Sequence, residues 1–426
     1  MIKNATTFFK DPTSQHVIIN TLGNYLNVGF TAFFALILVR ILSPSQYGVL
    51  SVLLGIAYVL ANVLEFGTTA TIYSTVPSLY GKNDKQMYSF IKSTFFFQSL
   101  FSFVVIGTLI VLFPWLDKVF FKTGAPIADL YLTAISVLLF IWQNFLTNIL
   151  FAAKRFLRAN LYINAANIIK TAFVLLIAYF GKINVGMVIF AFGVLGPLTF
   201  FLLMFWRNKK LTREMKAAPI RKEEFKFSYT MKYFVASQFY NLGLRMDLFL
   251  LSFFGLREQV GYYGLAQKII LTIIASIVSI SQVLSPRFAT IKTRKEAFRQ
   301  MRTGLVYMLL PTTVFIALYF TPDFIFELVF TGTFKETAAI THILALPFIL
   351  NALGTIPNLF LLYTVKKPGY ILVSNILFFL IISVGSYLMI PQKGMYGPPL
   401  AILLAFIVAV GIQVLAVWWE QKGMDR

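Results

Sequence analysis

The chain has 426 residues, of which 58% are hydrophobic and only 12% are charged, with 37 Lys and Arg against 16 Asp and Glu. A soluble domain carries about 25% charged residues, and so much apolar surface cannot be buried in a water-soluble fold. The composition therefore predicts an integral membrane protein. The lack of cysteine excludes disulfides and thiolate metal sites, and His16 and His342 alone are too few for a histidine metal centre.

Twelve apolar segments are each long enough to cross a bilayer core, which takes about 20 helical residues. They form two six-helix lobes, residues 1–206 and 227–426, joined by a basic cytoplasmic linker at 207–226. The sequence thus predicts an all-α membrane protein with twelve transmembrane helices and no soluble domain. In chain order the segments cover residues 16–39, 46–74, 88–114, 127–152, 159–181, 184–206, 227–253, 259–285, 303–321, 337–362, 368–390 and 395–419.

The basic residues predict the orientation of the chain. With the N-terminus inside, the inner loops and tails hold 25 of the 37 Lys and Arg, and the outer loops hold seven. Cytoplasmic loops carry such an excess, so both termini are expected in the cytoplasm. The positive charge is therefore a topology signal that also attracts anionic membrane lipids, and no nucleic-acid partner is expected.

An internal repeat relates the two lobes. Short patterns of the first lobe recur in the second at shifts of 208 to 214 residues. Each repeat has an even number of helices, so both enter from the same side, which predicts a pseudo-two-fold axis along the membrane normal and a central cavity. The matching pairs are Asn27 with Asn241, Gly48 with Gly261, Pro77 with Pro286, Asn167 with Asn375, Gly186 with Gly394, and Trp206 with Trp419.

Five segments resemble, in order along the chain, those of a known transporter family. They are VRILSPSQYG (39–48), LRMDLFLLSFFG (244–255), LREQVGYYGLAQK (256–268), LSPRFA (284–289) and IPQKGMYGPPLA (390–401). On these the sequence is identified as a member of the O-antigen/capsule-type polysaccharide flippases of the MOP (multidrug/oligosaccharidyl-lipid/polysaccharide) exporter superfamily. The pair Pro398-Pro399 departs from the small residues usual there and predicts a kink in the last helix.

The resemblance implies a transporter and not an enzyme. The implied substrate is an undecaprenyl-pyrophosphate-linked oligosaccharide, moved from the cytoplasmic to the outer leaflet of a bacterial or archaeal cytoplasmic membrane. A polysaccharide polymerase and glycosyltransferases are the expected partners, and the chain is expected to work as a monomer.

Basic residues inside the predicted helices indicate where an anionic head group would bind. Lys170 and Lys268 lie near the midplane, where a lysine costs roughly 2.5–3.5 kcal/mol, so we expect them to face a cavity. Pyrophosphate binding would offset that cost, and a structural ion pair is the alternative. Arg245 suits phosphate through its planar fork. Arg40 at the outer mouth and Lys232 at the inner one either contact the substrate or anchor their helices.

Polar and acidic residues complete the predicted site. Asp247 has three interpretations: an ion pair with Lys268, a site for coupling H⁺ or Na⁺, or an interface charge. Glu65 is a second proton-site candidate or a partner for a basic loop. In the repeat, Lys170 corresponds to Phe378, so one asymmetric site is expected. Side chains for sugar hydroxyls, or alternatively for interhelical hydrogen bonds, are Asn144, Asn167 and Asn241 with Gln143, Asn148, Asn164 and Gln238.

No cofactor is expected, and the chain has no phosphate-cradling GxxxxGK[ST] motif for ATP hydrolysis. The transport step is expected to draw on the membrane potential or on an H⁺ or Na⁺ gradient. Three alternatives stay open. A cation-coupled multidrug antiporter of the same superfamily would need acidic residues at mid-depth. A lipid II flippase would be expected to carry two further helices. A membrane enzyme would need a large catalytic loop, whereas the loops at 114–126 and 322–336 are short.

Overall fold

The computed structural model describes residues 12–65, 67–181, 183–224, 227–289, 291 and 293–423, and these form helices without any strand. Nine helical stretches of the described residues are long and apolar enough to cross a membrane. One of them, Gly369–Lys422, contains two of the predicted spans, and a shorter apolar helix covers Tyr25–Ile41. The helical membrane architecture that the sequence predicts is therefore confirmed.

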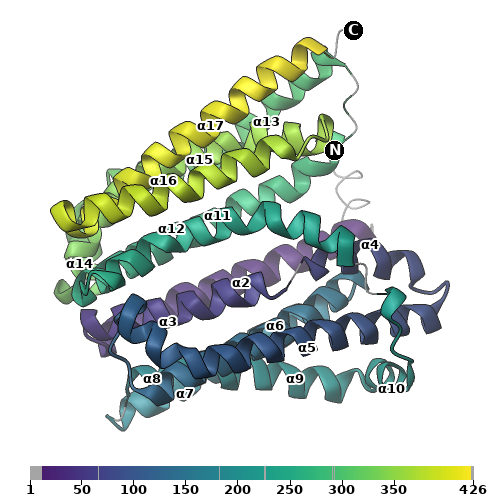
Figure 1. The fold of residues 1–426 in the computed structure, drawn as a ribbon, viewed down its shortest axis with the longest axis horizontal. Helices are drawn as coiled ribbons and strands as arrows, with labels where there is room; N and C mark the ends of the chain where they lie inside the picture. The colour runs from purple at the N-terminus through teal and green to yellow at the C-terminus, as the bar shows by residue number, and fades with distance from the viewer. Residues whose placement is uncertain are drawn as a thin grey trace, which may run out of the picture. The chain divides into compact units, whose positions relative to one another are not determined.

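The chain forms two compact units. Unit 1 comprises Met1–Ile37, Leu53–Leu116 and Ala125–Phe234. Its helices α5, α6, α7 and α9 pack side by side (Figure 1), with Phe90, Phe145 and Phe200 fully buried between them. The helices that lie wholly or mainly in unit 1 are α2 (Pro12–Ile41), α3 (Pro44–Val63), α4 (Thr68–Leu79), α5 (Asp84–Leu116), α6 (Ile127–Ala152), α7 (Phe156–Tyr179), α8 (Val185–Ile189), the π-helix η2 (Phe190–Leu195), α9 (Gly196–Arg207) and α10 (Lys209–Ala217).

Unit 2 comprises Leu38–Val52, Asp117–Gly124 and Val235–Arg426. In its centre α15 packs against α12, α13 and α17, and α16 lies along α17 (Figure 1). Its helices are α11 (Phe227–Phe253), α12 (Arg257–Ala289), α13 (Arg294–Tyr319), α14 (Asp323–Phe330), α15 (Glu336–Leu359), α16 (Gly369–Lys393) and α17 (Gly397–Gly423), together with the short π-helices η1 (Asp117–Phe121) and η5 (Phe360–Thr364).

Two short pieces of the first half of the chain therefore fold with the second half. The Ser252 hydroxyl donates to the Phe121 carbonyl, and the Phe121 ring packs on Phe249 at 5.4 Å. The turn at 38–52 is held by a reciprocal cap, since the Ser43 amide donates to Gln46 and the Gln46 amide to Ser43.

The start of α3 crosses the start of α12 at the two repeat-related glycines. A Cβ atom on Gly48 would overlap the carbonyl oxygen of Arg257, and one on Gly261 would overlap that of Pro44. Pro44 and Arg257 are separated by 213 residues, the same shift as Gly48 and Gly261. Each repeat thus contacts the other through the same surface, as a two-fold axis requires. This reciprocity supports the pseudo-two-fold relation predicted from the sequence.

Several boundaries differ from the prediction. The span expected at 46–74 is divided into α3 and α4, with Gly67 between them at a φ of 66°. The last helix is not kinked by its two prolines, because α17 begins at Gly397 and places Pro398 and Pro399 in the first turn. Amide hydrogens have no helical partner there, so proline is tolerated. Helices α10 and α14 lie where the sequence predicted only a linker and a loop.

Candidate functional site

Lys170 lies near the middle of α7 and faces other elements of unit 1. Its ammonium is 4.3 Å from the centre of the Phe192 ring, a cation–π distance, and Phe192 in turn packs on Phe34 of α2. The residue that faces the lysine side chain here is a glycine: a Cβ atom on Gly196 would lie 3.6 Å from Lys170 Cδ. The π-helix η2 and the glycine that follows it therefore make room for the lysine.

The amides near Lys170 hold α2 to α7. The Asn167 amide nitrogen donates to Asn27 Oδ1 at 2.8 Å, and Asn164 donates to the Gly23 carbonyl at 3.4 Å. Asn167 is only 4% exposed, so these bonds serve helix packing, which was the alternative to sugar binding. On α6, Asn144 is exposed and Gln143 half-buried.

Unit 2 holds a buried polar cluster on α11 and α12. Asp247, which is 1% exposed, accepts hydrogen bonds from the Tyr263 hydroxyl, the Gln267 amide and the Leu248 backbone. Gln267 also accepts from Arg245 Nη1 at 2.7 Å. Gln267 thus links Arg245 to Asp247 through hydrogen bonds.

The predicted ion pair between Asp247 and Lys268 does not form in the described part of the chain. The carboxylate is occupied by neutral donors from α12, one of them Gln267, the residue before the lysine. Gln267 was missed by the sequence analysis, although it is the middle residue of the Ala266-Gln267-Lys268 motif. Lys268 is half-buried and interacts unfavourably with the nearby charge of Arg245.

Glu65 lies in the break between α3 and α4. Its carboxylate accepts from the Thr69 amide at 3.1 Å and from the Thr69 hydroxyl, so it caps the start of α4. Thr69 in turn accepts from Asn148 Nδ2 at 2.5 Å, and Asn148 Oδ1 accepts from the Tyr73 hydroxyl at 3.3 Å. The partner of Glu65 is therefore the first turn of α4, and the expected contact with a basic loop is not found among the described residues.

The remaining predicted residues are dispersed. Arg40 is exposed in the last turn of α2 and belongs to unit 2. Asn241 and Gln238 lie half-buried on α11, and the side chain of Lys232 on the same helix lies outside the described residues. No group of three His, Asp or Glu residues in the described chain has the arrangement of a metal site.

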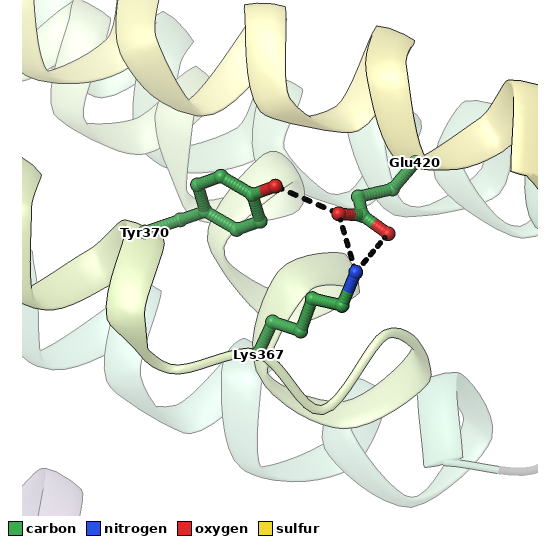
Figure 2. Close-up of polar contacts among 3 residues, drawn as sticks. All are labelled: Lys367, Tyr370 and Glu420. Carbon is green, nitrogen blue, oxygen red and sulfur yellow. Dashed lines mark hydrogen bonds and ion pairs between the residues drawn. The ribbon is translucent and has the colours of Figure 1, made fainter.

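A charged cluster joins the α15–α16 connection to the end of α17. Lys367 Nζ lies 2.8 and 2.9 Å from the two carboxylate oxygens of Glu420, and the Tyr370 hydroxyl donates to the same carboxylate at 2.7 Å (Figure 2). The hydrogen bonds with Glu420 raise the pKa of Lys367 above its ordinary value. This lysine is therefore fully compensated by a carboxylate.

The fold is similar to those of several solved transporters. The structure is similar to an inward-facing multidrug resistance MATE family transporter of that superfamily, with a TM-score of 0.74 and 13% identity over 95% of each chain. It is equally similar to the lipid II flippase MurJ in an inward closed conformation, with a TM-score of 0.74 and 14% identity over 94% of this chain and 87% of that one. The MATE multidrug transporter DinF-BH gives a TM-score of 0.68 at 14% identity over 98% and 97% of the two chains.

The chain belongs to the polysaccharide biosynthesis protein family, whose sequence model matches residues 14–292. This confirms the family that the sequence motifs indicated. The solved structures that resemble it are transporters and a flippase, and at 13–14% identity this likeness shows a shared fold. A search of curated protein sequences gave no match.

Proposed function

We propose that this chain moves a lipid-linked oligosaccharide across the cytoplasmic membrane by alternating access through a cationic central cavity. Membership of the polysaccharide biosynthesis family supports a saccharide-bearing substrate. The flippase fold supports a lipid-linked one. An undecaprenyl-pyrophosphate carrier is the expected form, because a pyrophosphate is the anion that buried lysines would bind.

The observation that carries the proposal is that the Asp247 carboxylate accepts hydrogen bonds from groups other than Lys268. Three neutral donors occupy its carboxylate, so it does not neutralise Lys268 by direct contact. A lysine at this depth is costly unless an anion or water meets it. A hydrogen bond to a charged group contributes about 1.5–3 kcal/mol, so one pyrophosphate contact would offset much of that cost. Arg245, in the same unit as Lys268, would add a further cationic contact, and Lys170 is proposed as a cationic contact of unit 1.

The membrane potential provides a driving force for such a substrate. Moving one charge across 100 mV is worth about 2.3 kcal/mol, and a head group with roughly two negative charges gains about twice that on leaving a negative interior. With both termini in the cytoplasm, the lysine-bearing sites would take up the head group from inside. Asp247 and Glu65 are the residues proposed for coupling to H⁺ or Na⁺ if a gradient also contributes.

The experiment is a flipping assay in proteoliposomes. A short undecaprenyl-pyrophosphate oligosaccharide is incorporated, and its appearance on the outside is followed with a membrane-impermeant lectin. Lys268→Ala is expected to lower the rate by roughly tenfold or more, as the loss of about 2 kcal/mol predicts. Lys268→Arg is expected to keep part of the rate. Lys393→Ala, which removes an exposed charge at the end of α16, is the matched control.

The same vesicles distinguish the alternatives. Uptake of a cationic dye with no movement of the oligosaccharide would favour a multidrug exporter. Movement of lipid II alone would favour the second alternative. Full flipping of the oligosaccharide by Lys268→Ala and Lys170→Ala, with both variants folded, would overturn the cationic site.

A further inference from the structure

Two arginines of unit 1 converge on one neutral oxygen. Arg155 precedes α7 and Arg158 lies in its first turn, and their Nη1 atoms donate to Asn208 Oδ1 at 3.3 and 2.9 Å. The two nitrogens are therefore no more than about 6 Å apart, a separation at which like charges repel. A neutral amide oxygen cannot compensate this repulsion.

The amide of Asn208 is fixed in place. It is 4% exposed, and its nitrogen donates to the Tyr162 hydroxyl at 3.1 Å and to the Met204 carbonyl at 3.0 Å. Because both hydrogens of the amide are used, Oδ1 must face the two arginines. The buried amide is thus a rigid support that holds the two guanidinium groups beside each other.

No carboxylate of the described chain forms an ion pair with either arginine. Glu214, the acidic residue of α10, pairs with Arg213 instead, at 3.3 Å. Arg155 is half-buried and Arg158 is exposed, so both can be reached from outside. Residues 153–158 and the linker 207–226 together carry eleven Lys and Arg against three Glu. Each guanidinium has five N–H donors, most of which remain for an external acceptor.

Unit 2 contains the repeat-related cluster with one decisive difference. Tyr162 and Tyr370 are separated by 208 residues, the same shift as Asn167 and Asn375. Each tyrosine hydroxyl contacts a side chain within two residues of the repeated tryptophan: Asn208, two residues after Trp206, in unit 1, and Glu420, one residue after Trp419, in unit 2 (Figure 2). Unit 2 therefore supplies a carboxylate to its basic loop, and unit 1 supplies an amide.

We propose that Arg155 and Arg158 form a phosphate-binding site at the cytoplasmic end of unit 1. The bound anion would take the place that the Glu420 carboxylate fills in unit 2. Paired guanidinium forks match the oxygens of a phosphate group, whereas a single lysine offers only a point charge. The neighbouring Trp206 is 64% exposed, as suits a side chain at the membrane interface, so the phosphate is that of a lipid.

Two lipids carry such a phosphate: an anionic phospholipid, or the pyrophosphate carrier of the proposed substrate. Full-length protein is placed in phosphatidylcholine nanodiscs, and either phosphatidylglycerol or undecaprenyl pyrophosphate is titrated in. Binding is followed by native mass spectrometry. The double variant Arg155→Gln/Arg158→Gln is expected to weaken binding of at least one lipid about tenfold. Arg213→Gln, which removes an arginine already paired with Glu214, is the matched control.

Two further variants use the difference between the units. Asn208→Asp introduces a carboxylate beside the arginines and is expected to abolish phosphate binding. Its ion pairs with the arginines oppose the loss of the bond to the Met204 carbonyl, so thermal unfolding is measured alongside to show that the variant is folded. Glu420→Gln removes the carboxylate of unit 2 and is expected to add a second, weaker site. Loss of only phosphatidylglycerol binding identifies a phospholipid site, and loss of only pyrophosphate binding identifies a substrate site.

Unchanged binding of both lipids in folded Arg155→Gln/Arg158→Gln, or in Asn208→Asp if the double variant does not fold, would overturn the proposal. The site does not depend on the proposed transport function. Phosphatidylglycerol binding can be lost while flipping by the same variant continues, and flipping can fail in Lys268→Ala while phosphate binding at Arg155 and Arg158 remains.

Discussion

The helices α7 of unit 1 and α16 of unit 2 are repeat-related but have different chemistry at one position. Asn167 and Lys170 of α7 correspond to Asn375 and Phe378 of α16. Phe378 is 1% exposed, with its ring 4.7 Å from that of Phe406 and 5.3 Å from that of Tyr240. Lys170 instead lies beside the ring of Phe192 and close to Gly196.

The comparison shows that the repeat determines the scaffold, whereas single residues determine the electrostatics. An aromatic cluster of this kind leaves no place for an ammonium group. A site that can accept a cation needs a polar or small neighbour and access to water or to an anion. Exchange of residues between the two helices tests this interpretation directly.

The largest effect is expected for Phe378→Lys. An uncompensated charge placed in the aromatic cluster should lower the free energy of unfolding by about 3–5 kcal/mol and prevent accumulation of folded protein. Thermal unfolding in detergent measures the change, and Phe378→Leu, which stays apolar, is the control. Normal stability of the lysine variant would show that α16 tolerates a charge as α7 does.

The reverse exchange, Lys170→Phe, should leave the fold intact and lower the flipping rate. Loss of a charge-assisted contact worth about 1.5–3 kcal/mol predicts a decrease of roughly tenfold to a hundredfold. Lys170→Arg should retain part of the rate. If Lys170→Phe flips normally, the difference between α7 and α16 has no role in transport.

Asp247→Asn tests the buried polar cluster of unit 2. An asparagine amide would face the donors of Tyr263, Gln267 and Leu248, so stability should fall by about 1–3 kcal/mol. Parallel melting and flipping measurements distinguish the two roles of Asp247. A variant with normal melting but no response to an imposed H⁺ or Na⁺ gradient would assign the residue to ion coupling instead.

The two repeats are alike where α3 crosses α12 at Gly48 and Gly261. Substitution of either glycine should therefore lower the free energy of unfolding. Gly48→Ala and Gly261→Ala each force a methyl group against a backbone carbonyl, at a cost of about 1–3 kcal/mol. Gly29→Ala and Gly107→Ala, where a Cβ meets nothing within 4 Å, are the controls. A large effect at only one of the two crossing glycines would contradict the two-fold relation.

The smallest effect is expected at the break between α3 and α4, where the sequence predicted one continuous helix over 46–74. Glu65→Ala removes the acceptor of the Thr69 amide and should destabilise the start of α4 by about 1 kcal/mol, whereas Glu65→Gln keeps an acceptor. Faster amide hydrogen exchange in α4 of the alanine variant is the measurement. Equal exchange in the two variants would exclude the capping role.

Most of the spans could be predicted because a bilayer selects long apolar helices, and α6 and α11 match the predicted residues at both ends. The break at Gly67 was not predicted: the sequence analysis placed Glu65, Gly67 and Thr68 within one span, and the positive φ of Gly67 shows that the helix is interrupted there. Charged candidates such as Lys170 were found by their cost in a membrane. Gln267 was not, because a neutral side chain carries no such cost, although it links Arg245 to Asp247.

The sequence by itself determined the membrane class, the helical repeat and the family, because each depends on local composition, periodicity or ordered motifs. Only the tertiary structure decided which partner each polar group has. It placed Tyr263 and Gln267 against Asp247, and it left Arg155 and Arg158 on a neutral amide where the other unit has a carboxylate. The physical reason is that hydrogen bonds and ion pairs depend on distances between atoms far apart along the chain, which only packing sets.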